Sequence, residues 1–291
     1  MNSLISLEVK PILLILVETT IFSLMLAIGI DLSFEKMLSL WRKPALLFRA
    51  LLAVVVLVPL VAILLLKLFN LPPEVMAGLA FLAASPGAPL TTKRSQMAGA
   101  RFRYSASLQL TLALLAVVIT PLTLAIFATL FERLSEKVTI LEVTRQVAMV
   151  QFLPVSLGLL IQKFAAKFAE KIAQPLTFMA NSLFLLLAIL VGLLGFPVLL
   201  KVWGLPLVAI LIMVIASLGI GHALGGSDDD KRSILAISCI ARNVGLAFFI
   251  AILNDVQQQV IPTLLAYLIL GAVLGVLYSI GHKRKLEKLT Q

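Results

Sequence analysis

The chain has 291 residues, of which 61% are hydrophobic and 13% charged, whereas soluble globular proteins carry roughly 25% charged residues. With a mean hydropathy of +1.10, this composition excludes a water-soluble protein and predicts an all-α polytopic membrane protein. The net charge of +10 does not indicate nucleic-acid binding, because Lys and Arg lie mostly in short clusters between apolar runs. The single cysteine, Cys239, excludes an internal disulfide and a multi-cysteine metal site.

Apolar runs long enough to span a bilayer, about 20 residues each, recur along the chain and predict nine transmembrane helices. In chain order these helices are expected at 11–32, 44–68, 73–100, 104–131, 140–164, 175–200, 203–225, 231–254 and 258–281. The connections are short, so residues 1–291 are expected to form a single transmembrane domain.

The connections alternate between rich and poor in Lys and Arg, in a ratio of about 16 to 6. The richer set holds the clusters around 36–43, 93–103, 163–171, 231–232 and 283–288. Lys and Arg mark cytoplasmic loops, so the N-terminus is predicted outside and the C-terminus in the cytoplasm. No signal peptide is expected, and the bacterial inner membrane is the simplest location.

Two of the predicted helices are interrupted. The third contains Pro86, Gly87 and Pro89, and the eighth carries Arg242 and Asn243 in the middle of an apolar run. Interrupted helices at corresponding positions of two halves of opposite topology are typical of transporters, where they form the binding site. The odd number of helices fits two such inverted halves with one helix missing at an end.

At these segments the chain resembles the bile acid:sodium symporter family. The similar stretches are "FNLPPEVMAGLAFLAASPGAP" (69–89), "SPGAPLTT" (85–92) and "ARNVGLA" (241–247). The resemblance implies ten helices in two inverted repeats, with two crossed, broken helices, of which this chain lacks the first helix. It places the first repeat at 11–131 and the second at 140–281. It also implies a core of 44–131 and 203–281 and a panel of 11–32 and 140–200.

The residues that would bind sodium in the family differ in this chain. By alignment with the family motifs, a Ser-Asn pair becomes Thr91 and Thr92, and an acidic residue becomes Ser238. A glutamine becomes Arg242, while the asparagine after it remains as Asn243. In the neighbouring helices, one hydroxyl residue of the family is kept as Ser105, and a second is replaced by Gln109. A glutamine of the family aligns with Val54.

These substitutions predict that the two broken helices bind an anion where they cross, and no cofactor is expected. No carboxylate lies close to the break in either segment, and a fixed cation beside a sodium ion opposes its binding. We expect a small organic anion, a carboxylate or sulfate, to bind where broken helices offer positive dipole ends. The expected contacts are Arg242, Asn243, Ser238, Thr91, Thr92, Lys93, Ser105 and Gln109, with Arg94 further along. A weakened sodium site of Thr91, Thr92 and Ser105 remains the alternative; no other metal is expected.

Three further residues have open interpretations. Arg242 lies about 16 Å into its helix, near the midplane, where it either serves function or forms a structural ion pair. Glu18 is the one carboxylate well inside a span, and either relays protons or has a structural role. Cys239 is expected to act as a small hydrophobe.

The sequence therefore predicts a secondary or facilitative carrier of small organic anions that works by alternating access, and no enzyme. The resemblance extends to carriers of bile acids, sulfated steroids, pyruvate and pantoate-like acids. The alternatives are a non-transporting sensor or scaffold on a transporter fold, and an arsenite-type metalloid efflux carrier. The bilayer is the expected surrounding; the sequence indicates neither the substrate nor an oligomeric state.

Overall fold

The computed structural model describes residues 2–32, 34–88, 102–131, 140–195 and 202–289. These residues are helical almost throughout and contain no strand, since a helix satisfies its own backbone hydrogen bonds in a bilayer. Eight described segments are long and apolar enough to cross a membrane, and α5 (Pro73–Ala84) is a shorter apolar helix. The prediction of an all-α polytopic membrane protein is confirmed. The rest of the predicted third span, 89–100, lies outside the described residues.

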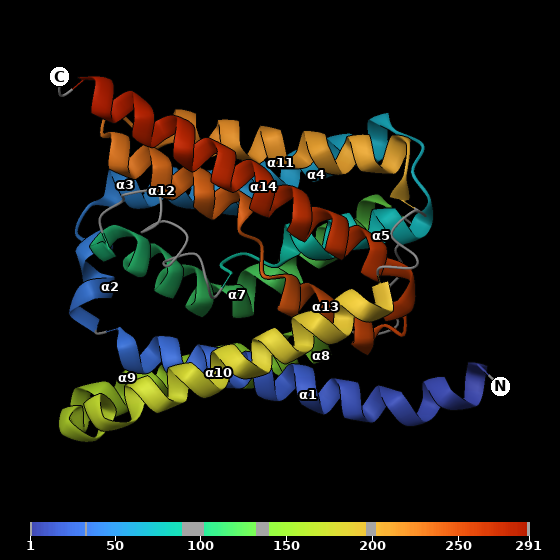
Figure 1. Ribbon diagram of the computed structural model, residues 1–291, viewed down its shortest axis with the longest axis horizontal. Coiled ribbons are helices and arrows are strands. Elements are labelled where there is room, and N and C mark those ends of the chain that lie inside the picture. Colours follow the sequence, from blue (N-terminus) through green and yellow to red (C-terminus); the bar gives the residue numbers. More distant parts are fainter. Residues whose placement is uncertain (1, 33, 89–101, 132–139, 196–201, 290–291) are drawn as a thin grey trace.

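One group of helices lies along the lower side of the molecule in Figure 1. It is called the lower layer, because its long helices pack mainly against one another. Its members are α1 (Asn2–Asp31), α8 (Ile140–Val147), η3 (Ala148–Phe152), α9 (Leu153–Phe164) and α10 (Ala166–Gly195). α1 and α9 pack closely: a Cβ on Gly29 would lie 2.9 Å from the Cα of Gly158.

The remaining helices form a larger bundle above this layer, called the main bundle (Figure 1). In its first half lie α2 (Phe34–Trp41), α3 (Pro44–Leu51), η1 (Leu52–Leu57), α4 (Val58–Leu68), α5 and α7 (Phe102–Leu130). In its second half lie α11 (Leu205–Leu224), α12 (Asp229–Ile240), α13 (Val244–Leu253) and α14 (Gln257–Leu289). The broken pair α12–α13 is the most enclosed: 89% of its most apolar 18-residue window is buried, against 17% for α10.

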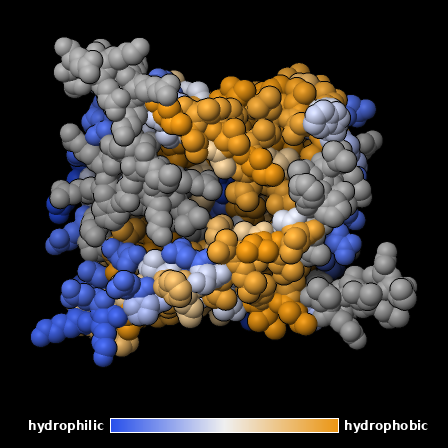
Figure 2. Space-filling view, in the orientation of Figure 1, coloured by the Kyte–Doolittle hydropathy of each residue, from blue (hydrophilic) through white to orange (hydrophobic). Residues whose placement is uncertain are grey.

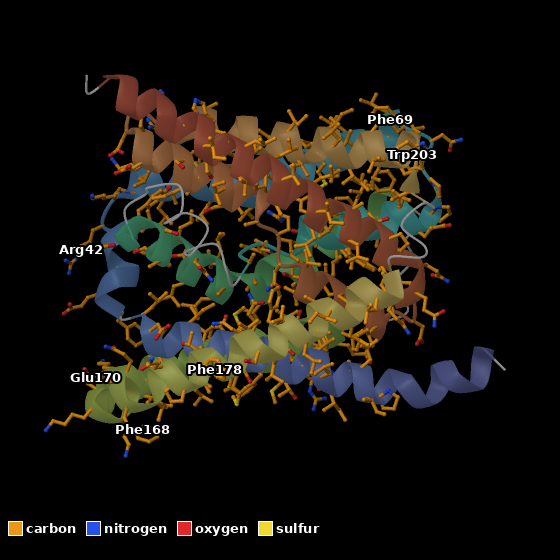
Figure 3. All side chains as sticks on the ribbon, viewed as in Figure 1. Arg42, Phe69, Phe168, Glu170, Phe178 and Trp203 are labelled. Carbon is orange, nitrogen blue, oxygen red and sulfur yellow. The ribbon has the colours of Figure 1, made fainter. Side chains whose placement is uncertain are left out.

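The helices run roughly parallel to one direction, with polar residues toward both ends. Figure 3 places Arg42 and Glu170 at one end and Phe69 and Trp203 at the other. Figure 2 shows a broad hydrophobic surface between these ends, as expected for contact with lipid. The connections around Arg42 and Glu170, which the charge pattern assigns to the same side, therefore do lie at the same end.

Two helices begin earlier than their hydropathy predicts. The sixth predicted span starts at 175, whereas α10 starts at Ala166 and carries Pro175 inside it. The first predicted span starts at 11, whereas α1 starts at Asn2 and contains Pro11. Hydropathy reports the bilayer core alone, and a helix continues beyond the core where its polar side chains are hydrated.

Two wide π turns were not predicted. In η1 the N–H of Val58 donates to Ala53 O, and in η3 the N–H of Leu153 donates to Ala148 O. A proline follows each donor by one position, Pro59 and Pro154, and has no N–H to continue the ladder. Each combination of a π turn and the proline after it therefore leaves one backbone carbonyl without a hydrogen-bond donor in its own helix. In η1 that carbonyl belongs to Val54. Four residues on, Val58 donates to Ala53 O instead, and five residues on, Pro59 has no N–H.

Candidate functional site

The two interrupted segments cross in the middle of the main bundle and pair with each other. α5 ends at Ala84 and α12 ends at Ile240, and non-helical backbone follows both. The N–H of Ala88 donates to Ala241 O at 3.1 Å, and the N–H of Asn243 donates to Ser85 O at 2.9 Å. These bonds satisfy backbone groups that the bilayer would leave unpaired. Residues 85–88 and 241–243 are named the crossing.

The side chain of Arg242 lies in this crossing and is buried, with 3% of its surface exposed. Its Nε donates to Leu82 O at 2.9 Å, its Nη1 donates to Val54 O at 3.0 Å, and its Nη2 donates to Ala83 O. All three acceptors are backbone carbonyls. Among the described residues, no carboxylate forms an ion pair with Arg242. The structural ion pair that the sequence left open for Arg242 is therefore not seen among the described residues.

The three carbonyls are available because of local breaks in their helices. Leu82 and Ala83 belong to the last turn of α5, where carbonyls lack i+4 donors and the helix dipole is negative. Leu82 O also accepts from the N–H of Ser85, at 3.1 Å. Val54 O is the carbonyl left free by the π turn and Pro59. The guanidinium therefore sits among converging backbone oxygens, an arrangement that also suits a hard cation.

Asn243 connects the crossing to the lower layer. Its Oδ1 accepts a bond from the N–H of Leu246 at 3.0 Å and caps α13. Its Nδ2 donates to Oε1 of Gln151, at 3.3 Å, and Nε2 of Gln151 donates to Ala113 O at 3.0 Å. Gln151 lies in η3 and is fully buried. This chain of bonds links α13 and α7 of the main bundle to the lower layer.

Several buried hydroxyls of the crossing, α12 and α7 have no hydrogen-bond partner in the described chain. Ser85 is in the crossing, Ser238 is in the last turn of α12, and Ser105 is in the first turns of α7. Each has at most 2% of its surface exposed. An unpaired buried hydroxyl costs about 1–3 kcal/mol, so such groups are candidates to bind a ligand. Cys239, next to Ser238, is fully buried.

The remaining predicted site residues divide into two sets. Gln109 is buried on α7, and Pro86 and Gly87 lie in the crossing. Thr91, Thr92, Lys93, Arg94 and Pro89 lie outside the described residues.

Glu18 is not at the crossing but lines a separate cavity. The cavity has a volume of about 550 Å³, and α1, α8, η3 and α9 form its walls. Its lining residues are Glu18, Thr19, Phe22, Arg145, Gln146, Met149, Val150 and Leu153. Val150 of η3 lines this cavity, and the next residue, Gln151, bonds to Asn243 of the crossing.

Two polar residues of this region were not predicted from the sequence. Gln151 bridges the two helix groups, and the hydroxyl of Tyr267 donates to Ile240 O at the end of α12, at 3.0 Å. Both stand alone in apolar runs, "VAMVQFLPV" and "LLAYLIL". An isolated polar side chain in mid-span is itself a signal of a partner or function. No group of three metal-binding His, Cys, Asp or Glu residues occurs in the described chain.

A profile of the Sodium Bile acid symporter family matches residues 19–202, more than half of the chain. The protein belongs to this family. No curated protein matches the chain. Members of the Sodium Bile acid symporter family are membrane transporters, and the eight apolar helices agree with that. The match covers the first break but ends before α11, so Arg242 and Asn243 lie beyond it.

Proposed function

We propose that this member of the Sodium Bile acid symporter family carries small organic anions without coupling to sodium. Arg242 supplies the positive charge at the crossing that a bound cation supplies elsewhere. The observation that carries the proposal is the position of the guanidinium, which donates to Leu82 O, Ala83 O and Val54 O. The proposal places the protein in the bacterial inner membrane, with the N-terminus outside.

The electrostatic cost of sodium beside Arg242 supports the absence of coupling. A unit charge about 4 Å from a sodium ion costs about 4 kcal/mol at an effective dielectric constant near 20. That is close to a thousandfold in affinity. The carbonyl oxygens that would coordinate the ion already accept bonds from the guanidinium. Sodium therefore meets both repulsion and the loss of ligands.

The same arrangement favours an anionic substrate. The charge of Arg242 is not matched by a carboxylate of the described residues, and three of its five N–H donors are used. The buried hydroxyls of Ser85, Ser105 and Ser238 add donors without partners. Together they can bind carboxylate or sulfate oxygens by charge-assisted bonds.

The test is uptake by the purified protein in proteoliposomes, with radiolabelled pyruvate, pantoate and a sulfated steroid. We expect wild-type uptake to be equal in sodium and in potassium buffer. In potassium buffer, Arg242→Gln should take up substrate about tenfold or more slowly than the wild type. In sodium buffer it should regain part of this uptake, because three carbonyls become free to coordinate the sodium ion. Lys67→Gln, which alters an exposed cation of α4, should behave as wild type. A sodium requirement in the wild type contradicts the proposal.

Glu18 is the candidate for proton coupling in this scheme, because it borders the cavity next to the crossing. If a pH gradient drives uptake, Glu18→Gln should remove that dependence. Absence of uptake for every anion would favour the sensor or scaffold alternative, and arsenite efflux would favour the metalloid alternative.

A further inference from the structure

A second charged cavity lies at the end of the main bundle, apart from the crossing. It has a volume of about 320 Å³ and lies between the start of α3 and the turn that joins α11 to α12. Its lining includes three cations, Lys43, Arg49 and Lys231, and one carboxylate, Asp228. The proposed carrier mechanism uses none of these residues.

The cavity has an excess of positive charge. Asp228 pairs with Lys231 at 2.7 Å, whereas Arg49 and Lys43 have no ion pair among the described residues. Both of these side chains are exposed. The cavity therefore offers two uncompensated cations to a ligand.

The turn between α11 and α12 leaves room for the guanidinium of Arg49. Gly226 has a positive φ of 85°, and a Cβ at this position would lie 3.3 Å from Nη1 of Arg49. The guanidinium thus lies over bare backbone, where a side chain would crowd it. The Nε of Arg232 donates to the carbonyl of the same Gly226, which holds the turn to α12.

Arg49 lies close enough to the start of its span for its side chain to reach lipid phosphates. It lies five residues after Pro44, about 7.5 Å into the span, where a long cationic side chain reaches the headgroups. The helix surfaces next to the cavity are exposed and apolar: they include Phe48 on α3, Val56 on η1 and Ile215 on α11. α11 packs against both α3 and α4.

We propose that this cavity binds the phosphate headgroup of an anionic phospholipid, whose acyl chains lie on the apolar faces of α3–α4 and α11. Cations between membrane helices at the headgroup level recognise anionic lipid headgroups. A zwitterionic lipid lacks the net charge to satisfy Lys43 and Arg49. A free phosphate lacks the chains that the neighbouring apolar surfaces accommodate.

The experiment measures lipid binding to the detergent-purified protein by native mass spectrometry. The probes are dioleoyl-phosphatidylglycerol, dioleoyl-phosphatidylcholine and glycerol 3-phosphate. The test variant is Lys43→Gln/Arg49→Gln, and Arg49→Lys retains the charge. The matched control is Lys167→Gln/Lys171→Gln, two exposed cations of α10 close to Glu170, at the same end as Arg42.

We expect phosphatidylglycerol to bind the wild type more tightly than phosphatidylcholine does. The test variant should bind phosphatidylglycerol about 25-fold more weakly, at about fivefold per cation, while the control and Arg49→Lys stay within about twofold of the wild type. Size-exclusion chromatography and thermal unfolding confirm that each variant is folded. Unchanged phosphatidylglycerol binding by the folded test variant overturns the proposal. So does equal binding of phosphatidylcholine, or of glycerol 3-phosphate, which would assign the cavity to a soluble phosphate.

Discussion

At the scale of single residues, Arg242 shows how a cation is held in the interior without a carboxylate. Removing its charge from water is costly, but three charge-assisted bonds to carbonyls offset the cost. Two of these carbonyls end a helix, so its dipole adds to the attraction. Asn243, the next residue, caps the following helix and contacts the lower layer. Arg242 thus binds carbonyls within the main bundle, whereas Asn243 begins α13 and joins it to the lower layer.

The fork geometry of Arg242 can be tested with a lysine. Arg242→Lys keeps the charge but has one nitrogen, which cannot reach carbonyls on both α5 and η1. We expect the free energy of unfolding to fall by about 2–4 kcal/mol, since buried acceptors lose charged donors. The measurement is a denaturant titration in mixed micelles. Arg145→Lys, an exposed position, is the control. Equal stability of both variants would show that the three bonds do not hold the crossing.

At the scale of elements, the breaks depend on residues that give the backbone unusual freedom. Pro86 ends the helical ladder, and Gly87 adopts a φ of +77°, which L-residues with a side chain rarely adopt. A Cβ on Gly87 would also lie 2.9 Å from Cβ of Leu112 on α7. The first break is therefore fitted against α7 as well as against the second break.

Gly87→Ala should destabilise the protein by about 1–3 kcal/mol, because it combines an unfavourable φ with a steric clash. Gly192→Ala is the matched control: this glycine is helical, and a Cβ would meet nothing within 4 Å. Thermal unfolding of both variants in detergent is the measurement. If Gly87→Ala is as stable as the control, the break does not require glycine.

At the scale of the whole molecule, alternating access requires relative movement of helix groups. We take the lower layer as the expected panel and the main bundle as the expected core. Near the crossing, the contacts between the two groups include the bonds of Gln151 to Asn243 and Ala113, and the approach of Ile21 to Gly245. A carrier cycle must break or rearrange these contacts.

A disulfide between the two groups should stop this movement. A Cβ on Gly245 would lie 3.7 Å from Cγ1 of Ile21, so Ile21→Cys/Gly245→Cys can be bridged with a small adjustment. In a Cys239→Ser background we expect oxidation to abolish uptake and dithiothreitol to restore it. The control pair, Ala27→Cys/Ala180→Cys, joins α1 to α10 within the lower layer. Uptake by the oxidised Ile21–Gly245 pair would argue against movement between the groups.

The sequence by itself determined the membrane class, the approximate spans and the positions of both breaks. These properties depend on local composition: apolar length sets a span, and Pro, Gly or a mid-span Arg interrupts it. The resemblance to the family also predicts that Arg242 stands in the place of a sodium ligand.

Only the tertiary structure decided what Arg242 contacts. Its acceptors lie 159 to 188 positions away in the chain, and they are backbone groups that no side-chain pattern identifies. Val54 shows the difference well: its side chain is apolar, yet its carbonyl reaches the site because a π turn and Pro59 leave it free. Long-range pairing depends on how helices pack, and the hydropathy of each helix does not encode it.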